Sequence, residues 1–313
     1  MTTSDFRDPR LTEQRNPRTE RIDVASSLEI VDLMNGEDTR VAGAVQAERE
    51  RIAAAIDLVV AAFQQGGRLV YVGAGTSGRL GVLDATECPP TFGTPPPMVV
   101  GVIAGGYGAL VKSAEGAEDD VNAGMAAMDA AAVTKSDVVA GIAASGTTPY
   151  VRAALGKAQT LGAKTVLITC ATPPKVLAET CDVVINPIVG PEVLTGSTRL
   201  KAGTATKLVL NTLTTGAMIR LGKAYGNLMV DLVALSQKLH DRGERIVMEV
   251  CGVSREDARK AIAGAEGSVK LAIVMVRKKV SATEGRRRLE QAGGLLRSVV
   301  GDPPPPAPPA AGR

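Results

Sequence analysis

The chain has 313 residues, which is enough for one large domain with additions or for two modest domains. Hydrophobic residues make up 45% of the sequence, but Trp is absent and only three Phe and four Tyr occur, so the core must be mainly aliphatic. The formal net charge of +3 arises from 36 basic and 33 acidic residues, so it gives no argument for nucleic-acid binding.

The sequence lacks the patterns that are typical of a metal site, a membrane span or a targeting segment. The four cysteines are scattered, without a C-x-x-C pair or neighbouring histidines, so we predict no metal site and no cofactor. The first residues are polar and charged, and no run approaches the roughly 18 apolar residues of a membrane helix. These features predict a cytoplasmic protein with no membrane partner.

The first part of the chain, residues 1–56, is predicted to be an arm followed by helices. Residues 1–25 are polar and suggest a flexible arm. Across residues 26–66, apolar side chains recur at near-helical spacing. The members of this pattern are Val41, Ala44, Val45, Ile52, Ile56, Val59 and Val60.

Residues 57–222 are predicted to form an α/β domain. Short β-rich runs occupy residues 68–73, 98–104, 137–143, 165–170 and 183–187, and helix-compatible stretches lie between most of them. Continuous apolar runs suit strands buried on both faces, and their alternation with helices indicates parallel βαβ units. The predicted fold class is therefore α/β, with a doubly wound, mainly parallel five-stranded sheet.

The remainder of the chain is predicted to be helical. A long helical pattern at residues 201–221 closes the α/β domain, and residues 223–300 follow as a C-terminal helical region with three short helices after residue 254. Ser254 and Ser281 each precede a carboxylate by three residues, which is a pattern for a helix start. Residues 301–313 are rich in proline and are predicted to form a disordered tail.

A glycine- and hydroxyl-rich loop follows the first predicted strand. Gly75, Thr76 and Ser77 stand where a strand leads into a helix, and such a turn offers unpaired N–H groups to a phosphate. The glycine spacing fits a dinucleotide-binding turn equally well. However, that interpretation needs an acid at the end of the second strand, where this chain has Ala104-Gly105-Gly106.

A second loop of this kind, residues 143–149, follows the third predicted strand. It carries the hydroxyls of Ser145, Thr147 and Thr148. Two such loops at strand carboxyl ends suit a compact phosphomonoester at the switch point of the sheet, without a nucleotide. Ordinary capping turns remain an alternative interpretation of both loops.

Several acids could carry chemistry. Glu87 precedes a Cys-Pro-Pro sequence that predicts a rigid turn directly behind it. Four further acids lie between residues 115 and 120, and composition does not choose among them, because acids are also common at helix starts. In residues 190–201, Glu192, Ser197 and Lys201 suggest either a capped helix entry or a lid over a sugar.

The motifs together resemble one enzyme family. The segments VGAGTSGRLGVLDATECPPTFG, AEGAEDD, IAASGTTPYV, TGSTRLKAGTATK and GNLMVDL are similar to those of bacterial N-acetylmuramic acid 6-phosphate etherases. The resemblance runs from about residue 11 to residue 300, and ATECPPTFG is highly specific. It implies a sugar isomerase (SIS) domain, a homodimer, and a helical C-terminal part.

The resemblance also implies chemistry and site residues. It implies cleavage of the lactyl ether of a phosphorylated amino sugar, with Glu87 and Glu118 as the paired catalytic glutamates and no cofactor. The phosphate or sugar ligands it suggests are Gly75, Thr76, Ser77, Ser145, Thr147 and Thr148. His240, the only histidine, is a weaker candidate, because related isomerases use a histidine for ring opening.

Two other functions remain open at this point. The glucokinase regulatory protein resembles this family and binds sugar phosphates without catalysis, although such proteins duplicate the domain and this chain shows no internal repeat. An aldose–ketose phosphate isomerase shares the fold. The segments around Glu87 and Glu118 favour the etherase over both alternatives.

Overall fold

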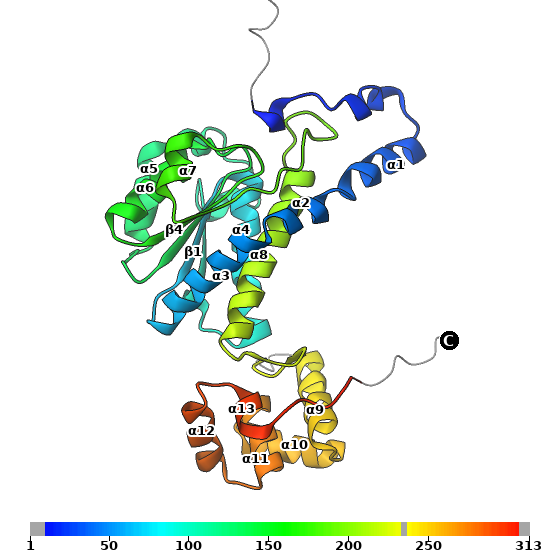
Figure 1. Ribbon diagram of the computed structural model, residues 1–313, viewed down its shortest axis with the longest axis vertical. Coiled ribbons are helices and arrows are strands. Elements are labelled where there is room, and N and C mark those ends of the chain that lie inside the picture. Colours follow the sequence, from blue (N-terminus) through cyan, green and yellow to red (C-terminus); the bar gives the residue numbers. More distant parts are fainter. Residues whose placement is uncertain (1–9, 233–236, 307–313) are drawn as a thin grey trace, which may run out of the picture. The chain divides into compact units, whose positions relative to one another are not determined.

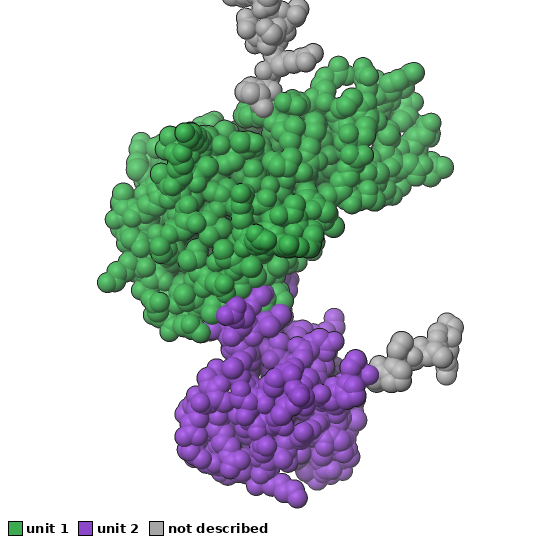
Figure 2. Space-filling model, viewed as in Figure 1, with its two compact units in different colours: residues 1–86, 96–215 green, residues 87–95, 216–313 purple. Residues whose placement is uncertain are grey.

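The computed structural model describes residues 10–232 and 237–306. Contacts divide the chain into two compact units, coloured separately in Figure 2. The first comprises residues 1–86 and 96–215, and the second comprises residues 87–95 and 216–313. The domain boundaries predicted after residues 56, 222 and 300 stay predictions.

The first unit is built on a parallel sheet of five strands in the order β2-β1-β3-β4-β5, so the predicted fold class is confirmed. The strands are β1 (Leu69–Gly73), β2 (Val99–Ile103), β3 (Val138–Ile142), β4 (Lys164–Ile168) and β5 (Val183–Ile185). All five coincide with β-rich runs of the sequence. The three central strands are almost entirely buried, because helices cover both faces of the sheet.

Helices flank the sheet on two sides (Figure 1). One face is covered by α5 (Val121–Ala130), α6 (Pro149–Thr160) and α7 (Lys175–Thr180), and the other by α3 (Arg49–Gln64), α4 (Gly75–Phe92) and α8 (Lys201–Arg220). Val70, Val72 and Val139 pack with Val151 and Leu155 of α6 in an aliphatic core. On the other face Tyr71 meets α4 so closely that a Cβ on Gly81 would lie 2.9 Å from its Cβ.

The segment before α3 is ordered where the structure describes it. Helices α1 (Ser27–Asp38) and α2 (Val41–Ala47) precede α3. Thr12, Asn16 and Thr19 are buried, and the Thr19 hydroxyl donates to the Val193 carbonyl at 2.8 Å. The prediction of a flexible arm is therefore wrong for residues 10–25, whose polar side chains find buried partners; residues 1–9 lie outside the described residues.

Helix α4 departs from the sequence prediction at its end. The Cys-Pro-Pro sequence predicted a turn, but Pro89 and Pro90 lie inside the helix, which continues to Phe92. Proline has no N–H, so the carbonyls of Ala85 and Thr86 lose their helical donors. The helix nevertheless continues for one more turn, and the N–H of Gly93 donates to the Pro89 carbonyl at 2.9 Å.

The second unit contains a short hairpin and five helices among its described residues. Strands β6 (Ala224–Tyr225) and β7 (Leu228–Met229) are antiparallel. The helices are α9 (Gln237–Cys251), α10 (Arg255–Gly264), α11 (Val269–Lys278), α12 (Ala282–Gln291) and α13 (Leu296–Val300), one more after residue 254 than predicted. Ser254 and Ser281 cap α10 and α12 as their spacing predicted.

The proline-rich tail begins in contact with this unit. The Tyr225 hydroxyl donates to the Gly301 carbonyl at 2.9 Å, and Pro303 lies against Gly226. The prediction of disorder for residues 307–313 lies outside the described residues. Among the residues that are described, no helix is long and apolar enough to span a bilayer.

Candidate active site

The first hydroxyl loop joins β1 to α4 through close backbone contacts. A Cβ on Gly73 would lie 2.7 Å from the nitrogen of Gly78, and a Cβ on Gly78 would lie 2.6 Å from Cγ1 of Ile103. Gly75 has a φ of +53°, a conformation that favours glycine. The loop therefore exposes the first turn of an 18-residue helix, whose free N–H groups and positive dipole end attract anions.

The second hydroxyl loop joins β3 to α6. The hydroxyl oxygens of Ser145 and Thr147 lie 2.9 Å apart, and the N–H of Thr147 donates to Oγ of Ser145 at 3.3 Å. Thr148 occupies the N-cap position of α6, where its side chain forms no capping hydrogen bond. All three side chains are partly buried, so they are packed in the loop but remain accessible to solvent.

The two loops flank the switch point of the sheet. Gly73 at the end of β1 pairs with Ile142 at the end of β3, while β2 lies on the other side of β1. The strand order reverses between β1 and β3, since β2 follows β1 on one side and β3 follows on the other, and ligands of open α/β sheets bind in the crevice at such a point. The structure thus brings Thr76 and Ser77 to the same edge as the second loop.

Glu118 lies beside the first hydroxyl loop. It belongs to a short turn, Ala117–Asp119, that packs against α6. It also lines a cavity of about 140 Å³ together with Gly75, Arg79 and Glu115. The Arg79 guanidinium donates to the Leu110 carbonyl at 3.1 Å, which fixes one cation at the cavity wall. An acidic side chain, a guanidinium and a helix N-terminus therefore adjoin the switch point.

Glu87 lies in the exposed part of α4, ten residues beyond Ser77. Ten residues of α-helix correspond to about 15 Å along the axis. The lining of the cavity that contains Glu118 does not include Glu87. Along α4, then, Glu87 is well separated from the loop that begins the helix.

Comparison with known proteins identifies the family. The chain is 52% identical over 290 residues to the N-acetylmuramic acid 6-phosphate etherase of Yersinia pestis (strain Pestoides F), which covers 93% of this chain and 98% of that protein. The chain belongs to the N-acetylmuramic acid 6-phosphate etherase family. The etherase of Yersinia pseudotuberculosis serotype O:1b (strain IP 31758) gives the same identity and coverage.

Two further comparisons concern the sugar isomerase domain. A family model described as the glucokinase regulatory protein N-terminal SIS domain matches residues 51–159. The solved structure of a phosphoheptose isomerase from Neisseria gonorrhoeae covers 61% of this chain and 99% of its own, with a TM-score of 0.46 and 18% identity. The match of the family model to residues 51–159 agrees with the SIS domain that the motifs of this etherase family member predicted.

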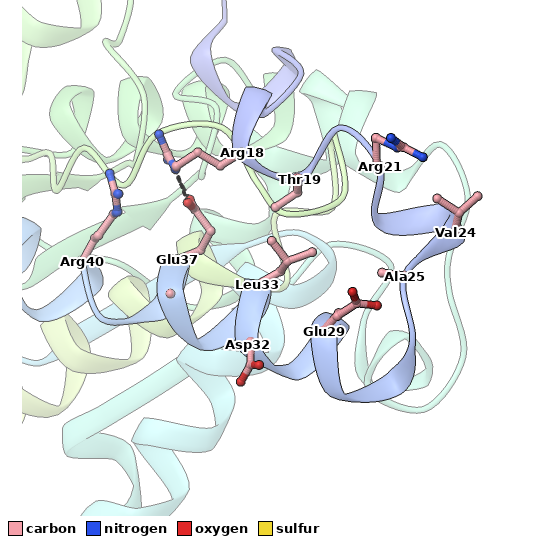
Figure 3. A pocket seen from close by; sticks show the side chains of 11 residues that line it. Arg18, Thr19, Arg21, Val24, Ala25, Glu29, Asp32, Leu33, Glu37 and Arg40 are labelled. Carbon is pink, nitrogen blue, oxygen red and sulfur yellow. Dashed lines mark hydrogen bonds and ion pairs between the residues drawn. The ribbon is translucent and has the colours of Figure 1, made fainter.

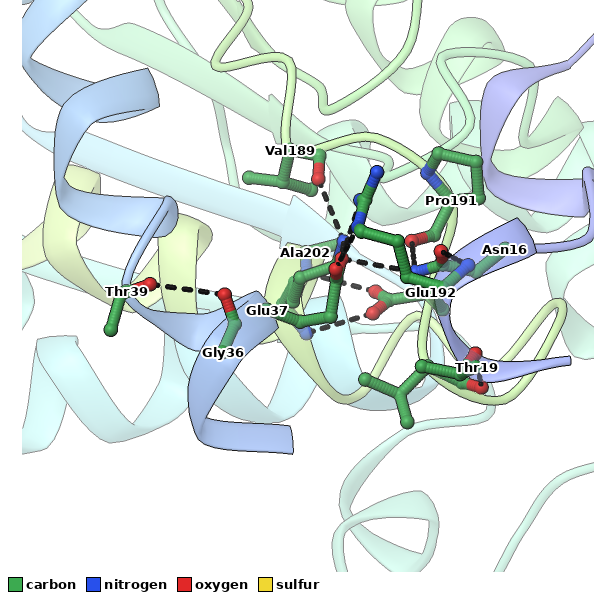
Figure 4. Close-up of polar contacts among 12 residues, drawn as sticks. Asn16, Thr19, Gly36, Glu37, Thr39, Val189, Pro191, Glu192 and Ala202 are labelled. Atoms are coloured by element: carbon green, nitrogen blue, oxygen red, sulfur yellow. Dashed lines mark hydrogen bonds and ion pairs between the residues drawn. The ribbon is translucent and has the colours of Figure 1, made fainter. Parts of the chain in front are cut away.

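Glu192 and Lys201 of this etherase family member are enclosed rather than exposed to a ligand (Figure 4). The Glu192 carboxylate accepts from the N–H groups of Lys201 and Ala202 at 3.0 and 2.9 Å, which caps α8. The Lys201 ammonium donates to Glu37 at 2.6 Å and to the Val189 carbonyl at 2.9 Å. Ser197, in the preceding turn, is half-buried.

Glu37 is the centre of this buried network. Its carboxylate accepts from Asn16 at 2.9 Å and from the Arg18 guanidinium, as well as from Lys201. These donors, Arg18 first, hold the pKa of Glu37 far below its usual value. Burial, by contrast, raises the pKa of Glu192, and its two backbone donors only partly oppose that effect. The network ties residues 16–18 to the start of α8.

A further cavity of the first unit lies at the N-terminal helices, where Figure 3 shows its lining. It has a volume of about 650 Å³ and is bordered by Arg18, Leu33, Glu37 and Arg40, among others. Arg18 and Glu37 are already paired with each other there. Neither hydroxyl loop contributes to this cavity, so it is a poor candidate for the active site.

His240 belongs to the second unit. It is exposed on α9 and lines a cavity of about 460 Å³ with Lys223, Asp231 and Ser268. Asp231 is paired with the ammonium groups of Lys223 and Lys270 at 3.3 and 3.1 Å. Nowhere in residues 10–232 and 237–306 do three His, Cys, Asp or Glu side chains lie together as metal ligands would.

The sequence reasoning missed two charged residues of α4, Arg79 and Asp84. Arg79 lines the cavity with Glu118, and its position directly after the Gly78 of the loop could have indicated a cation at the helix start. Asp84 is buried on α4, where its carboxylate accepts from the hydroxyls of Tyr71 and Thr214 at 2.9 and 3.3 Å. Asp84 thereby connects α4 to β1 and α8. In the sequence, only its position as an acid among apolar residues could have indicated this role.

Proposed function

We propose that this chain cleaves the D-lactyl ether of N-acetylmuramic acid 6-phosphate and releases N-acetylglucosamine 6-phosphate and D-lactate. The observation that carries the proposal is the 52% identity over 93% of the chain to an etherase of that name. The enzyme is a carbon–oxygen lyase of cell-wall amino-sugar recycling, and we propose a cytoplasmic location for it.

The hydroxyl loops at the switch point are proposed to hold the phosphate. Thr76, Ser77, Ser145, Thr147 and Thr148 offer neutral donors from two neighbouring loops, and Gly75 lets the ligand approach the backbone. The first turns of α4 and α6 add N–H groups and two positive dipole ends. A dianionic phosphomonoester suits this combination better than a neutral sugar does.

The proposed chemistry acts on the ring-opened sugar. There the proton on C2 lies next to an aldehyde and is acidified, so a general base can remove it. The C2=C3 double bond then forms as the C3–O bond breaks, and the departing oxygen takes a proton to give lactate. Water adds to C3 and C2 is reprotonated, so the net change is hydrolysis of the ether.

Glu118 and Glu87 are proposed to transfer these protons. Glu118 shares a cavity with Gly75 of the first hydroxyl loop, and its turn packs against α6, which supports a role as the base at C2 or as the activator of water. Glu87 is proposed as the acid that protonates the departing oxygen. Each transfer contributes roughly 10²–10⁴-fold to the rate.

The remaining predicted residues receive more limited roles. Ser197 is proposed to contact the sugar. Glu192 and Lys201 are proposed to support binding indirectly, since their buried contacts hold residues 189–202 in place. His240 stays a candidate for opening the sugar ring.

A homodimer is proposed as the working form. Exposed aliphatic side chains occur on α1, α4 and α8, and exposed apolar surface is typical of a region that a partner covers. They are Leu28 and Val31 on α1, Leu83 on α4, and Leu208 and Ile219 on α8.

The matching SIS model of the glucokinase regulatory protein favours one alternative, a sugar-phosphate sensor without catalysis. Incubation with N-acetylmuramic acid 6-phosphate in ¹⁸O-water separates the possibilities. The etherase releases lactate and incorporates one labelled oxygen at C3, whereas a sensor binds the sugar and releases nothing. An aldose–ketose isomerase would change the sugar without forming lactate.

The glutamates and the phosphate loop are tested by variants. Glu87→Gln and Glu118→Gln should each lower lactate release at least 100-fold while substrate still binds, and Glu256→Gln, on an exposed pair, is the control. Ser145→Ala should lower the affinity for glucosamine 6-phosphate about tenfold, because one charge-assisted hydrogen bond to the ligand is lost. Thr160→Ala, at the other end of α6, should not. Unchanged affinity of the Ser145 variant would exclude it as a ligand.

A further inference from the structure

Arg79 carries a guanidinium that the fold leaves without an acidic partner. Its Nε–H donates to the Leu110 carbonyl at 3.1 Å, and within residues 10–232 and 237–306 the guanidinium has no other hydrogen bond and no ion pair. A guanidinium has five N–H donors in a rigid fork, so four of them remain for another acceptor. The side chain is half-buried, and its bond to Leu110 holds it in place. The guanidinium of Arg79 is therefore fixed in position but largely unused.

The cavity of about 140 Å³ beside the first hydroxyl loop combines this cation with acids and small apolar groups. Among the described residues that line it, Arg79 is the one cation, while Glu115 and Glu118 are acidic. Two acids repel an incoming anion, so a carboxylate is stable in this cavity only where it meets the guanidinium. Alanines form most of the remaining wall, and they are Ala74, Ala104, Ala109, Ala114 and Ala117. Such a wall suits a small acid that carries a methyl group beside its carboxylate.

The proposed substrate carries two anions, the phosphate on C6 and the lactyl carboxylate on the C3 oxygen. Eight bonds separate the phosphorus atom from the carboxylate carbon, which is at most about 10 Å when the chain of atoms is extended. Arg79 is four residues after Gly75, so the two lie on one side of α4, about 6 Å apart along the axis. A phosphate bound at the first hydroxyl loop therefore leaves the carboxylate within reach of the guanidinium.

We propose that Arg79 binds the lactyl carboxylate of the substrate and makes the site selective for an ether that carries an acid. The inference rests on the proposed etherase function. A bidentate pair between guanidinium and carboxylate orients the C3–O bond beside Glu118, which lines the same cavity. The product N-acetylglucosamine 6-phosphate has no carboxylate, so the sugar loses this pair as lactate departs.

The first test changes the ligand and leaves the protein intact. The wild-type chain receives either N-acetylmuramic acid 6-phosphate or the same sugar with its lactyl carboxylate converted to the amide, and kcat/KM for release of the lactyl group is measured. The neutral amide should react roughly 10- to 100-fold less efficiently, because a hydrogen-bonded pair of charges is lost. Equal kcat/KM for the acid and the amide would overturn the inference.

The second test changes Arg79. Arg79→Gln should lower kcat/KM for the acid by the same factor, roughly 10- to 100-fold, and should hardly alter kcat/KM for the amide. Its inhibition constant for N-acetylglucosamine 6-phosphate should stay within about twofold of the wild-type value. Arg79→Lys keeps the charge without the fork of donors, so its kcat/KM for the acid should lie between those of the wild type and Arg79→Gln. Arg49→Gln, on an exposed pair with Glu50 in α3, is the control and should change none of these values.

Each other outcome has a defined meaning. If Arg79→Gln weakens the acid, the amide and N-acetylglucosamine 6-phosphate alike, Arg79 binds the phosphate or only supports the segment at Leu110, which overturns the inference and leaves the etherase intact. Absence of lactate release by the wild type would instead reject the proposed function. Calorimetric titration with both sugars then shows whether the carboxylate adds affinity that Arg79→Gln removes. If circular dichroism shows that Arg79→Gln does not fold, the comparison of acid and amide with the wild-type chain decides.

Discussion

The buried pair of Glu37 and Lys201 should make Glu37→Gln one of the most destabilising substitutions in the first unit. The Lys201 side chain is 0% exposed and that of Glu37 is 3% exposed, and their charged atoms lie 2.6 Å apart. Removal of one partner leaves a buried charge without compensation, at a cost of about 3–5 kcal/mol. With a urea dependence of about 2–3 kcal/mol per M, the unfolding midpoint should fall by roughly 1–2 M.

Urea unfolding at pH 7, followed by circular dichroism, measures this cost. Glu256→Gln removes an exposed pair with Lys260 as a matched control and should cost less than about 0.5 kcal/mol. The double variant Glu37→Leu/Lys201→Met removes both charges and should recover most of the loss, because apolar replacements of a buried pair are often neutral. A cost below 1 kcal/mol for Glu37→Gln, or no recovery in the double variant, would refute the reasoning.

The pH dependence gives an independent check on the same group. The pKa of Glu37 is lowered in the folded state, mainly by Arg18, so the unfolded chain binds its proton first as the pH falls. The stabilisation is complete at pH values above the unfolded pKa of about 4.3 and decreases below it. The difference between wild type and Glu37→Gln should therefore be full at pH 7 and shrink between about pH 4 and pH 2. A difference that grows as the pH falls would contradict this assignment.

Three further predictions concern two backbone positions and one helix cap. Gly78→Ala would place a Cβ 2.6 Å from Ile103 and 2.7 Å from the Gly73 carbonyl, so it should abolish lactate release and lower stability by at least 2 kcal/mol, about the scale of core overpacking. Gly156→Ala on α6, with open space around its Cβ, should instead stabilise by about 0.5–1 kcal/mol. Ser281→Ala should cost about 1 kcal/mol of stability in the second unit by loss of the α12 cap, as thermal unfolding can measure.

Much of the fold could be predicted because its strands are buried on both faces. Such strands appear as short continuous apolar runs, and all five runs became strands. The helix starts at Ser254 and Ser281 could be predicted because each cap is a local hydrogen bond, in which the serine side chain accepts from the N–H three residues later. The order of residues 10–25 could not be predicted in this way, since it depends on Glu37 and Val193, which are remote in sequence.

The same contrast between local and remote contacts applies to the candidate site. The hydroxyl loops were predictable because strand carboxyl ends of a doubly wound sheet meet at one edge. The burial of Lys201 was not, since a lysine at a helix start is usually exposed and only Glu37, 164 residues away, accounts for it. Local patterns thus predict which loops meet at one edge of the sheet, while the partner of a buried charge is a property of the tertiary fold.

Helix α4 shows why a catalytic pair can be predicted while its geometry is not. Motif similarity points to Glu87 and Glu118. The spacing of Thr76, Leu80, Leu83 and Glu87 puts them on one side of a helix, but it does not tell whether that side faces the sheet. The buried contacts of Gly81 with Tyr71 and of Val82 with Gly101 supply that direction. Because those contacts occupy the sheet-facing side, Glu87 and the two leucines must share the outward side. The same packing that fixes α4 on its own sheet therefore leaves Glu87 on the exposed side of the helix.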